Sequence, residues 1–239
     1  MSNGHSLLKA FSTISLILTL GVSMNAEAGI FGFGGTSWKE EVLLHDGSKI
    51  IVERSITRGG HGIAHQELVT DESLTFTMPG TNQNVIWEDK FSEDLGGSSF
   101  SPMMLEISKD MVYLVVTPMG CLSYNKWGRP NPPYVVFKYQ DKAWQRIKLQ
   151  ALPDELKMPN LIHSSPDSEA KKTGQSIVSA ETIKALIEGY IRPESKTVMR
   201  EALTKARIDQ MCEERVLYKG SWILPNDPIA RKFIDLQKK

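Results

Sequence analysis

Four pairs of apolar or aromatic runs, each pair separated by a short polar turn, follow one another through the first two thirds of this chain. The clearest pair flanks the turn at residues 45–48, where an Asp-Gly step between β-branched runs is among the strongest short-range signals for a hairpin. The predicted hairpins pair residues 38–45 with 48–56, 74–78 with 85–87, 104–107 with 112–116, and 134–139 with 144–149. Four successive hairpins predict an antiparallel β-meander, folded as a sandwich or as one curved sheet.

Helix signals replace the aromatic-rich runs in the last third of the chain. Ser165 followed by Pro166 is typical of a helix N-terminus, and Gly174 is typical of a helix end. Ser179 begins a second predicted helix, whose apolar residues recur at i, i+3, i+4 and i+7 until Pro193 ends it. This spacing gives the second helix an apolar face that is expected to pack on the sheet.

The remaining C-terminal residues predict a third helix near 195–211, a small hairpin over 215–224 and a terminal helix from Asp227 to about residue 236. The predicted fold class is therefore α+β, with three to four C-terminal helices packed on the meander. Residues 29–152 form the β-rich region. Residues 153–239 form a mainly helical region that is expected to belong to the same domain.

The first 28 residues have the organisation of a secretory signal peptide. Lys9 supplies a short basic region, residues 10–22 form an apolar run, and Ala26-Glu27-Ala28 is an A-x-A cleavage site. The apolar run is shorter than the about 20 residues of a membrane-spanning helix, and no second run of this kind follows. The sequence predicts cleavage after Ala28 and a soluble periplasmic or secreted protein with no transmembrane segment in its mature form.

The chain contains two cysteines, Cys121 and Cys212. Export places them in an oxidising compartment, so we expect them to form one disulfide that ties the β-rich region to the helical region. A closed loop of about 90 residues corresponds to about 4–5 kcal/mol in the chain-entropy model. Neither cysteine lies in a C-x-x-C motif, which disfavours a redox-active role.

The charge balance of the chain disfavours two classes of partner. Among 239 residues, 28 basic and 28 acidic residues give a formal net charge of zero. Nucleic acids and anionic membranes select an excess of basic residues, so neither is expected as a partner. No phosphate-binding loop, dinucleotide fingerprint, H-E-x-x-H or G-x-S-x-G motif occurs, and no cofactor is predicted. An envelope protein or a small ligand is the expected kind of partner.

A proline-rich segment between two predicted strands is the most distinctive internal part of the sequence. It joins Tyr124, Trp127, Arg129 and Tyr134 to three prolines. Prolines reduce the entropy that a loop loses on binding, and aromatic and arginine side chains are the usual anchors of recognition surfaces. The segment predicts a binding surface made by these four residues. The alternative is a rigid connection whose aromatic rings pack back on the sheet beside the disulfide.

Three histidines, His45, His61 and His65, lie within a short stretch, and the last two have the i, i+4 spacing of zinc or copper ligands on a helix. Their context is different, because residues 58–62 are glycine-rich and His45 belongs to a predicted turn. Solvated loop histidines are therefore the alternative to a metal site.

The run over residues 121–130 (CLSYNKWGRP), taken with the preceding hairpin and the export signal, resembles a set of uncharacterised exported proteins of Gram-negative bacteria. The resemblance covers most of the mature chain and implies a periplasmic location, but it transfers no activity, cofactor or catalytic residue. The sequence favours a binding or interaction module without catalytic activity. A metal-dependent periplasmic hydrolase and a structural component of an envelope assembly are the alternatives.

Overall fold

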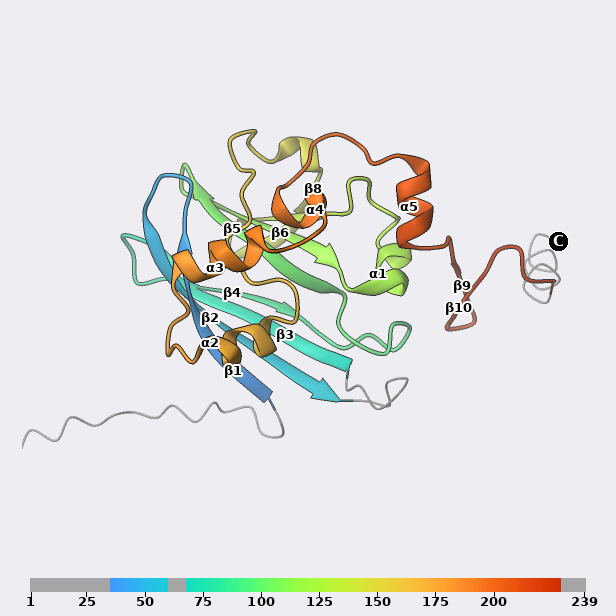
Figure 1. Cartoon of the computed structure of the whole chain (residues 1–239), viewed down its shortest axis with the longest axis horizontal. Coiled ribbons are helices and arrows are strands. Elements are labelled where there is room, and N and C mark those ends of the chain that lie inside the picture. The colour runs from blue at the N-terminus through green and yellow to red at the C-terminus, as the bar shows by residue number, and fades with distance from the viewer. Residues whose placement is uncertain (1–34, 60–67, 229–239) are drawn as a thin grey trace, which may run out of the picture. The chain divides into compact units, whose positions relative to one another are not determined.

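A computed structural model describes residues 35–59 and 68–228 of the chain (Figure 1). The predicted signal peptide with its cleavage site, His61, His65 and most of the helix expected from Asp227 lie outside these residues.

The first two predicted hairpins are confirmed and form one antiparallel sheet. Its strands are β1 (Gly35–Leu43), β2 (Lys49–Gly59), β3 (Leu68–Thr77) and β4 (Asn84–Asp89), paired in the order β1-β2-β3-β4. The first turn is closed by Asp46, whose Oδ1 accepts hydrogen bonds from the backbone N–H (2.9 Å) and hydroxyl (2.6 Å) of Ser48. Gly47 adopts a φ of 86°, which explains the glycine at this position.

The third and fourth predicted hairpins are confirmed and form a second sheet of the same order. Its strands are β5 (Phe100–Ser108), β6 (Met111–Pro118), β7 (Val135–Gln140) and β8 (Ala143–Ile147). Two-residue turns close both hairpins, and both residues of each turn have positive φ: Lys109 and Asp110 (51° and 61°), and Asp141 and Lys142 (53° and 61°). Left-handed turns of this kind match the twist of paired strands.

The two sheets pack face to face, so the meander folds as a sandwich and not as one curved sheet. Alternate residues of both sheets contribute to one buried cluster, which includes Val42, Val52, Leu74, Phe76 and Trp87 from the first sheet and Phe100, Leu105, Leu114, Val116 and Val135 from the second. The other face of the second sheet is also buried, because Leu152, Leu156 and Val198 cover Met104 and Val115. The β5-β6 strands are therefore apolar on both faces.

One side of the sandwich is closed by the side chain of Asn160. Its Nδ2 donates to the carbonyl oxygens of Leu43 (3.0 Å) and Leu105 (2.8 Å), and its Oδ1 accepts from the N–H of Leu105 (2.9 Å). On the opposite side Trp144 of β8 donates to the carbonyl of Ile86 in β4 (2.7 Å). Both pairs of facing edges are thus joined by a side chain.

The helices are short and lie mostly after the strands. They are α1 (Gly120–Lys126), the 3-10 turn η2 (Leu149–Ala151), α2 (Pro166–Thr173), α3 (Ala180–Glu188), α4 (Pro193–Lys196) and α5 (Lys205–Met211), followed by the small hairpin of β9 (Val216–Tyr218) and β10 (Ser221–Ile223). The predicted helices after Ser165 and Ser179 and the predicted small hairpin are confirmed. Ser179 caps α3 by accepting a hydrogen bond from the N–H of Thr182. The sequence did not predict α1, which has no side-chain cap.

The predicted helix near residues 195–211 is wrong in extent, because residues 197–204 separate α4 from α5. Arg200 donates to the carbonyls of Leu149 (2.8 Å) and Pro153 (2.7 Å), and the N–H of Val198 donates to the carbonyl of Lys157 (2.8 Å). These bonds hold the segment on the turn around η2. In a continuous helix the N–H of Val198 would instead be used within the helix.

Three buried charged side chains lie on the inner face of the first sheet. Arg54 and Glu40 are 0% exposed and Glu72 is 2% exposed. The guanidinium of Arg54 pairs with Glu40 at 2.9 Å and with Glu72 at 2.5 Å. Arg54 also donates to the carbonyl of Ile162, and Glu40 accepts from the N–H of the same residue (3.1 Å). The triad therefore fixes the backbone immediately before His163, a residue of the site described below.

The triad gives the stability of the fold an unusual pH dependence. Burial raises the pKa of Glu72 to about 7 and the pKa of its cross-strand neighbour Asp89 to about 6. A carboxyl with a higher pKa in the folded than in the unfolded state stabilises the fold fully below its unfolded pKa, and this contribution is lost as the pH rises through the folded pKa. The rise of the Glu72 pKa from 4.5 to about 7 corresponds to about 3 kcal/mol of unfolding free energy.

We therefore expect the melting temperature followed by circular dichroism to fall more steeply in the wild type than in Glu72→Gln as the pH is raised from about 5 to about 8, because the variant lacks the largest of these titrations. Burial lowers the pKa of His163 to about 4, so this residue acts in the opposite direction below about pH 6.5, equally in both proteins. Equal slopes in the wild type and the variant would contradict the assignment.

Candidate functional site

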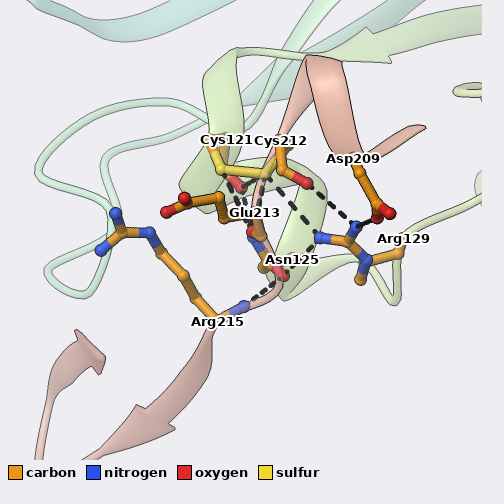
Figure 2. Close-up of a disulfide and its surroundings, with 7 residues drawn as sticks. All are labelled: Cys121, Asn125, Arg129, Asp209, Cys212, Glu213 and Arg215. Atoms are coloured by element: carbon orange, nitrogen blue, oxygen red, sulfur yellow. Dashed lines mark hydrogen bonds and ion pairs between the residues drawn. A yellow bond between two sulfur atoms is a disulfide. The ribbon is translucent and has the colours of Figure 1, made fainter. Parts of the chain in front are cut away.

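The expected disulfide is present in the structure. It joins Cys121 of α1 to Cys212, the residue that ends α5, across a sequence separation of 91, with the two Cα atoms 5.2 Å apart (Figure 2). It thus ties the β-rich region to the helical region. A disulfide is consistent with an oxidising compartment.

Asn125 connects the same two segments by hydrogen bonds (Figure 2). Its Nδ2 donates to the carbonyls of Cys121 (2.9 Å) and Glu213 (3.0 Å), while its Oδ1 accepts from the N–H of Arg215 (2.9 Å). The residues that follow Cys212 are therefore held against α1 by more than the disulfide.

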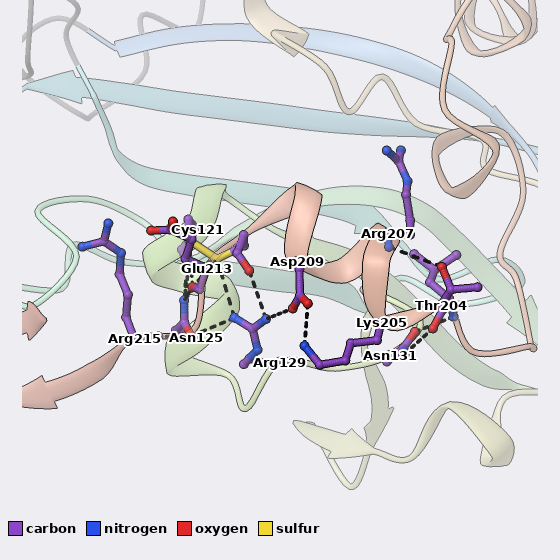
Figure 3. A network of polar contacts seen from close by, with 12 residues as sticks. Cys121, Asn125, Arg129, Asn131, Thr204, Lys205, Arg207, Asp209, Glu213 and Arg215 are labelled. Carbon is purple, nitrogen blue, oxygen red and sulfur yellow. Dashed lines mark hydrogen bonds and ion pairs between the residues drawn. A yellow bond between two sulfur atoms is a disulfide. The ribbon is translucent and has the colours of Figure 1, made fainter. Parts of the chain in front are cut away.

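Arg129, one of the four predicted anchors, is committed to contacts within the fold. Its Nη2 donates to the carbonyl of Cys212 (3.0 Å), and its guanidinium lies 5.2 Å from the ring of Tyr124 and 4.0 Å from Asp209. Figure 3 shows Arg129 between the disulfide and Asp209. A cation at the C-terminus of α5 complements the partial negative charge of the helix end.

Asn131 joins the proline-rich segment to the residues before α5. Its Oδ1 accepts from the N–H of Leu203 (2.7 Å), and its Nδ2 donates to the carbonyl of Leu203 (2.9 Å) (Figure 3). The next residue, Thr204, caps the N-terminus of α5. The proline-rich segment is thus bonded to both ends of α5, through Asn131 at the start of the helix and Arg129 at its end.

The other three predicted anchors also contact the body of the protein. Tyr124 and Tyr134 are buried, and the hydroxyl of Tyr134 donates to the carbonyl of Glu194 (2.9 Å). The ring of Trp127 packs on Phe100 with centroids 4.5 Å apart. This arrangement is the one expected of a rigid connection, and direct recognition by these side chains stays a prediction.

One of the three histidine candidates, His45, lies within the described residues. Nδ1 of His45 lies 2.9 Å from Oε2 of Glu106, a buried carboxylate whose pKa is raised by burial. Within residues 35–59 and 68–228 no group of three or more His, Cys, Asp or Glu side chains could hold a metal ion. His61 and His65 lie outside those ranges.

A pocket of about 270 Å³ opens beside the disulfide. Five separate parts of the chain line it: the end of β6 (Thr117, Pro118), α1 with the proline segment (Gly120, Cys121, Tyr124, Pro133), the loop before α2 (His163, Ser164), the start of α4 (Arg192, Glu194, Ser195) and the end of α5 (Met211, Cys212). The lining therefore includes both cysteines and one predicted anchor, Tyr124.

One buried polar atom among the residues of this lining, the hydroxyl of Tyr124, makes no hydrogen bond with any described residue. Burial raises the pKa of Tyr124, so its hydroxyl keeps its proton. Burial also lowers the pKa of His163 to about 4, so the imidazole is neutral near pH 7. The ring of His163 is held edge-on against Tyr190, with centroids 4.6 Å apart.

Two charged residues of the lining come from the start of α4. Arg192 is exposed, and its side chain has no hydrogen bond or ion pair to any residue in the described part of the chain. Glu194 is 5% exposed, and its Oε1 accepts a hydrogen bond from Arg207 (2.8 Å). The pocket therefore combines an available cation with a buried carboxylate.

Sequence reasoning missed the five lining residues that carry most of the pocket's polar chemistry, namely His163, Ser164, Arg192, Glu194 and Ser195. They lie in the loop before α2 and at the start of α4, about 30 residues apart, and no motif spacing connects them. The sequence signals beside them, Ser165-Pro166 and Pro193, indicate helix boundaries and not a binding site.

Comparison with known proteins assigns no family to the chain. No family model, no curated protein and no solved structure matches it. Among the described residues, no helix has the length and apolar character needed to cross a membrane.

Proposed function

We propose that the protein is an exported binding protein without catalytic activity, which takes a small polar ligand in the pocket beside the disulfide. The observation that carries this proposal is the charged part of the lining, where the exposed guanidinium of Arg192, which has no partner among the described residues, lies on the same pocket as the carboxylate of Glu194. A guanidinium without a partner can bind a carboxylate group of a ligand through two parallel hydrogen bonds.

The walls of the pocket support a binding function because they are fixed before a ligand arrives. The disulfide, Asn125 and Arg129 hold the end of α5 against α1. A preorganised site loses little entropy on binding. In this proposal the proline-rich segment serves as scaffold for the pocket, with Tyr124 as its contribution to the lining. Export is supported by the signal-like first 28 residues and by the disulfide.

A thermal-shift screen of sugars, organic acids, amino acids and nucleosides tests the proposal. A ligand at about 100 times its Kd adds about 2.7 kcal/mol of stability, a shift of several degrees. We expect one class to raise the melting temperature of the wild type. Ser164→Trp should abolish that shift, because Ser164 is exposed in the lining and an indole would fill the pocket.

Ser168→Trp is the matched control, since Ser168 is exposed on α2 and does not line the pocket. It should leave the ligand-induced shift unchanged. The proposal fails if no class stabilises the wild type, or if the stabilising compounds act equally on Ser164→Trp.

A further inference from the structure

The two charges in the pocket have opposite signs and lie two residues apart. Arg192 is the residue before the first turn of α4, and Glu194 lies in that turn. Both line the same cavity. Because the neighbouring imidazole of His163 is neutral near pH 7, these two residues are the charged side chains of the lining. The cavity therefore suits a ligand that carries one negative and one positive group.

Each of the two charges has bonding capacity left for a ligand. The guanidinium of Arg192 carries no partner among the described residues, and a guanidinium binds a carboxylate through two parallel hydrogen bonds. On Glu194, Arg207 occupies Oε1, and no hydrogen bond to Oε2 is found within the described ranges. A carboxylate oxygen accepts from an ammonium group in the same way that it accepts from lysine.

The rest of the lining is divided between hydroxyls and apolar groups. Ser164 and Ser195 add hydroxyls, and Pro118, Pro133 and Met211 add apolar surface. The volume of about 270 Å³ lies just below the usual range for ligand pockets, which runs from about 300 to 1,000 Å³. A ligand of this size has few atoms beyond its two charged groups.

We infer that the pocket binds a free α-amino acid with an apolar side chain, its carboxylate on Arg192 and its ammonium on Glu194. This inference rests on the binding function proposed above and names its ligand class. The two charges select a zwitterion, and the prolines and Met211 contact its side chain.

Isothermal titration with three matched probes tests the inference: L-leucine, N-acetyl-L-leucine, which lacks the ammonium charge, and L-leucinamide, which lacks the carboxylate. We expect L-leucine to bind, and each blocked form to bind at least about tenfold more weakly, the loss of one charge-assisted contact. Arg192→Gln should weaken L-leucine binding by a similar factor without changing the affinity for the amide. Glu194→Gln should do so without changing the affinity for the acetylated form.

One control variant separates binding from folding. Lys196→Gln removes a cation from the same short helix that does not line this pocket, and it should bind L-leucine like the wild type. Circular dichroism verifies that every variant is folded.

The outcomes distinguish this inference from the function on which it rests. The amino-acid inference is overturned if L-leucine and its acetylated form bind with equal affinity. It is also overturned if another compound class stabilises the protein while L-leucine does not bind. Either result leaves the proposed binding pocket in place. Absence of binding by every class in the thermal-shift screen overturns both. Loss of binding in Lys196→Gln as large as that in Arg192→Gln also overturns the assigned contact.

Discussion

Replacing Arg54 by methionine is expected to lower the free energy of unfolding by about 3–5 kcal/mol. The change leaves Glu40 and Glu72 buried on the inner face of the first sheet without their cation. It also removes the hydrogen bond to the carbonyl of Ile162, which positions the backbone before His163. Guanidinium chloride denaturation of the purified variant measures the loss.

Lys39→Met is the matched control for Arg54→Met. Lys39 lies on the neighbouring strand β1, and its ion pair with Glu53 is about half exposed, with 3.9 Å between the charged atoms. An exposed pair of this kind contributes less than about 1 kcal/mol. The interpretation of the triad is wrong if Arg54→Met costs no more than Lys39→Met.

The pH dependence of this loss provides a second check on the same variant. In Arg54→Met the two carboxylates can avoid unpaired charge by binding protons. The loss should therefore be smaller at about pH 5 than at about pH 8. Arg54→Met combined with Glu72→Gln should lose less than the single variant at the higher pH, because one unpaired carboxylate is gone.

The parts of the fold that the sequence predicts are those governed by local chemistry. Asp46 and Gly47 close the first hairpin through bonds within the turn itself, and Ser179 caps the helix that follows it. Such contacts join residues a few positions apart, so their pattern is visible in the sequence. The break between α4 and α5 was missed because it depends on Arg200, whose partners lie about 50 residues earlier.

The proline-rich segment shows why the site was harder to predict than the fold. Tyr134 and Arg129 have the composition of a recognition surface, but composition does not say whether a side chain points to solvent or to a carbonyl of its own chain. Here both donate to backbone carbonyls from the last third of the sequence, Glu194 and Cys212. The pocket arises from that long-range packing, which is why its charged residues carried no sequence signal.

Removal of the disulfide is the other change with a large expected effect. The double variant Cys121→Ser/Cys212→Ser should lose up to about 4–5 kcal/mol of unfolding free energy, because the closed loop has a sequence separation of 91. Wild-type protein kept in reductant should unfold at the same denaturant concentration as the double variant. The double variant itself should not respond to reductant.

Without the disulfide, the end of α5 is held against α1 by Arg129 and Asn125. The effect of Arg129→Met should therefore be larger in the double cysteine variant than in the wild type, by about 1 kcal/mol, the scale of coupling between groups in contact. Strict additivity in this double-mutant cycle would show that the disulfide and the polar contacts act independently. Coupling of the expected sign would instead establish that Arg129 belongs to the scaffold that holds Cys212 and Met211 in the pocket wall.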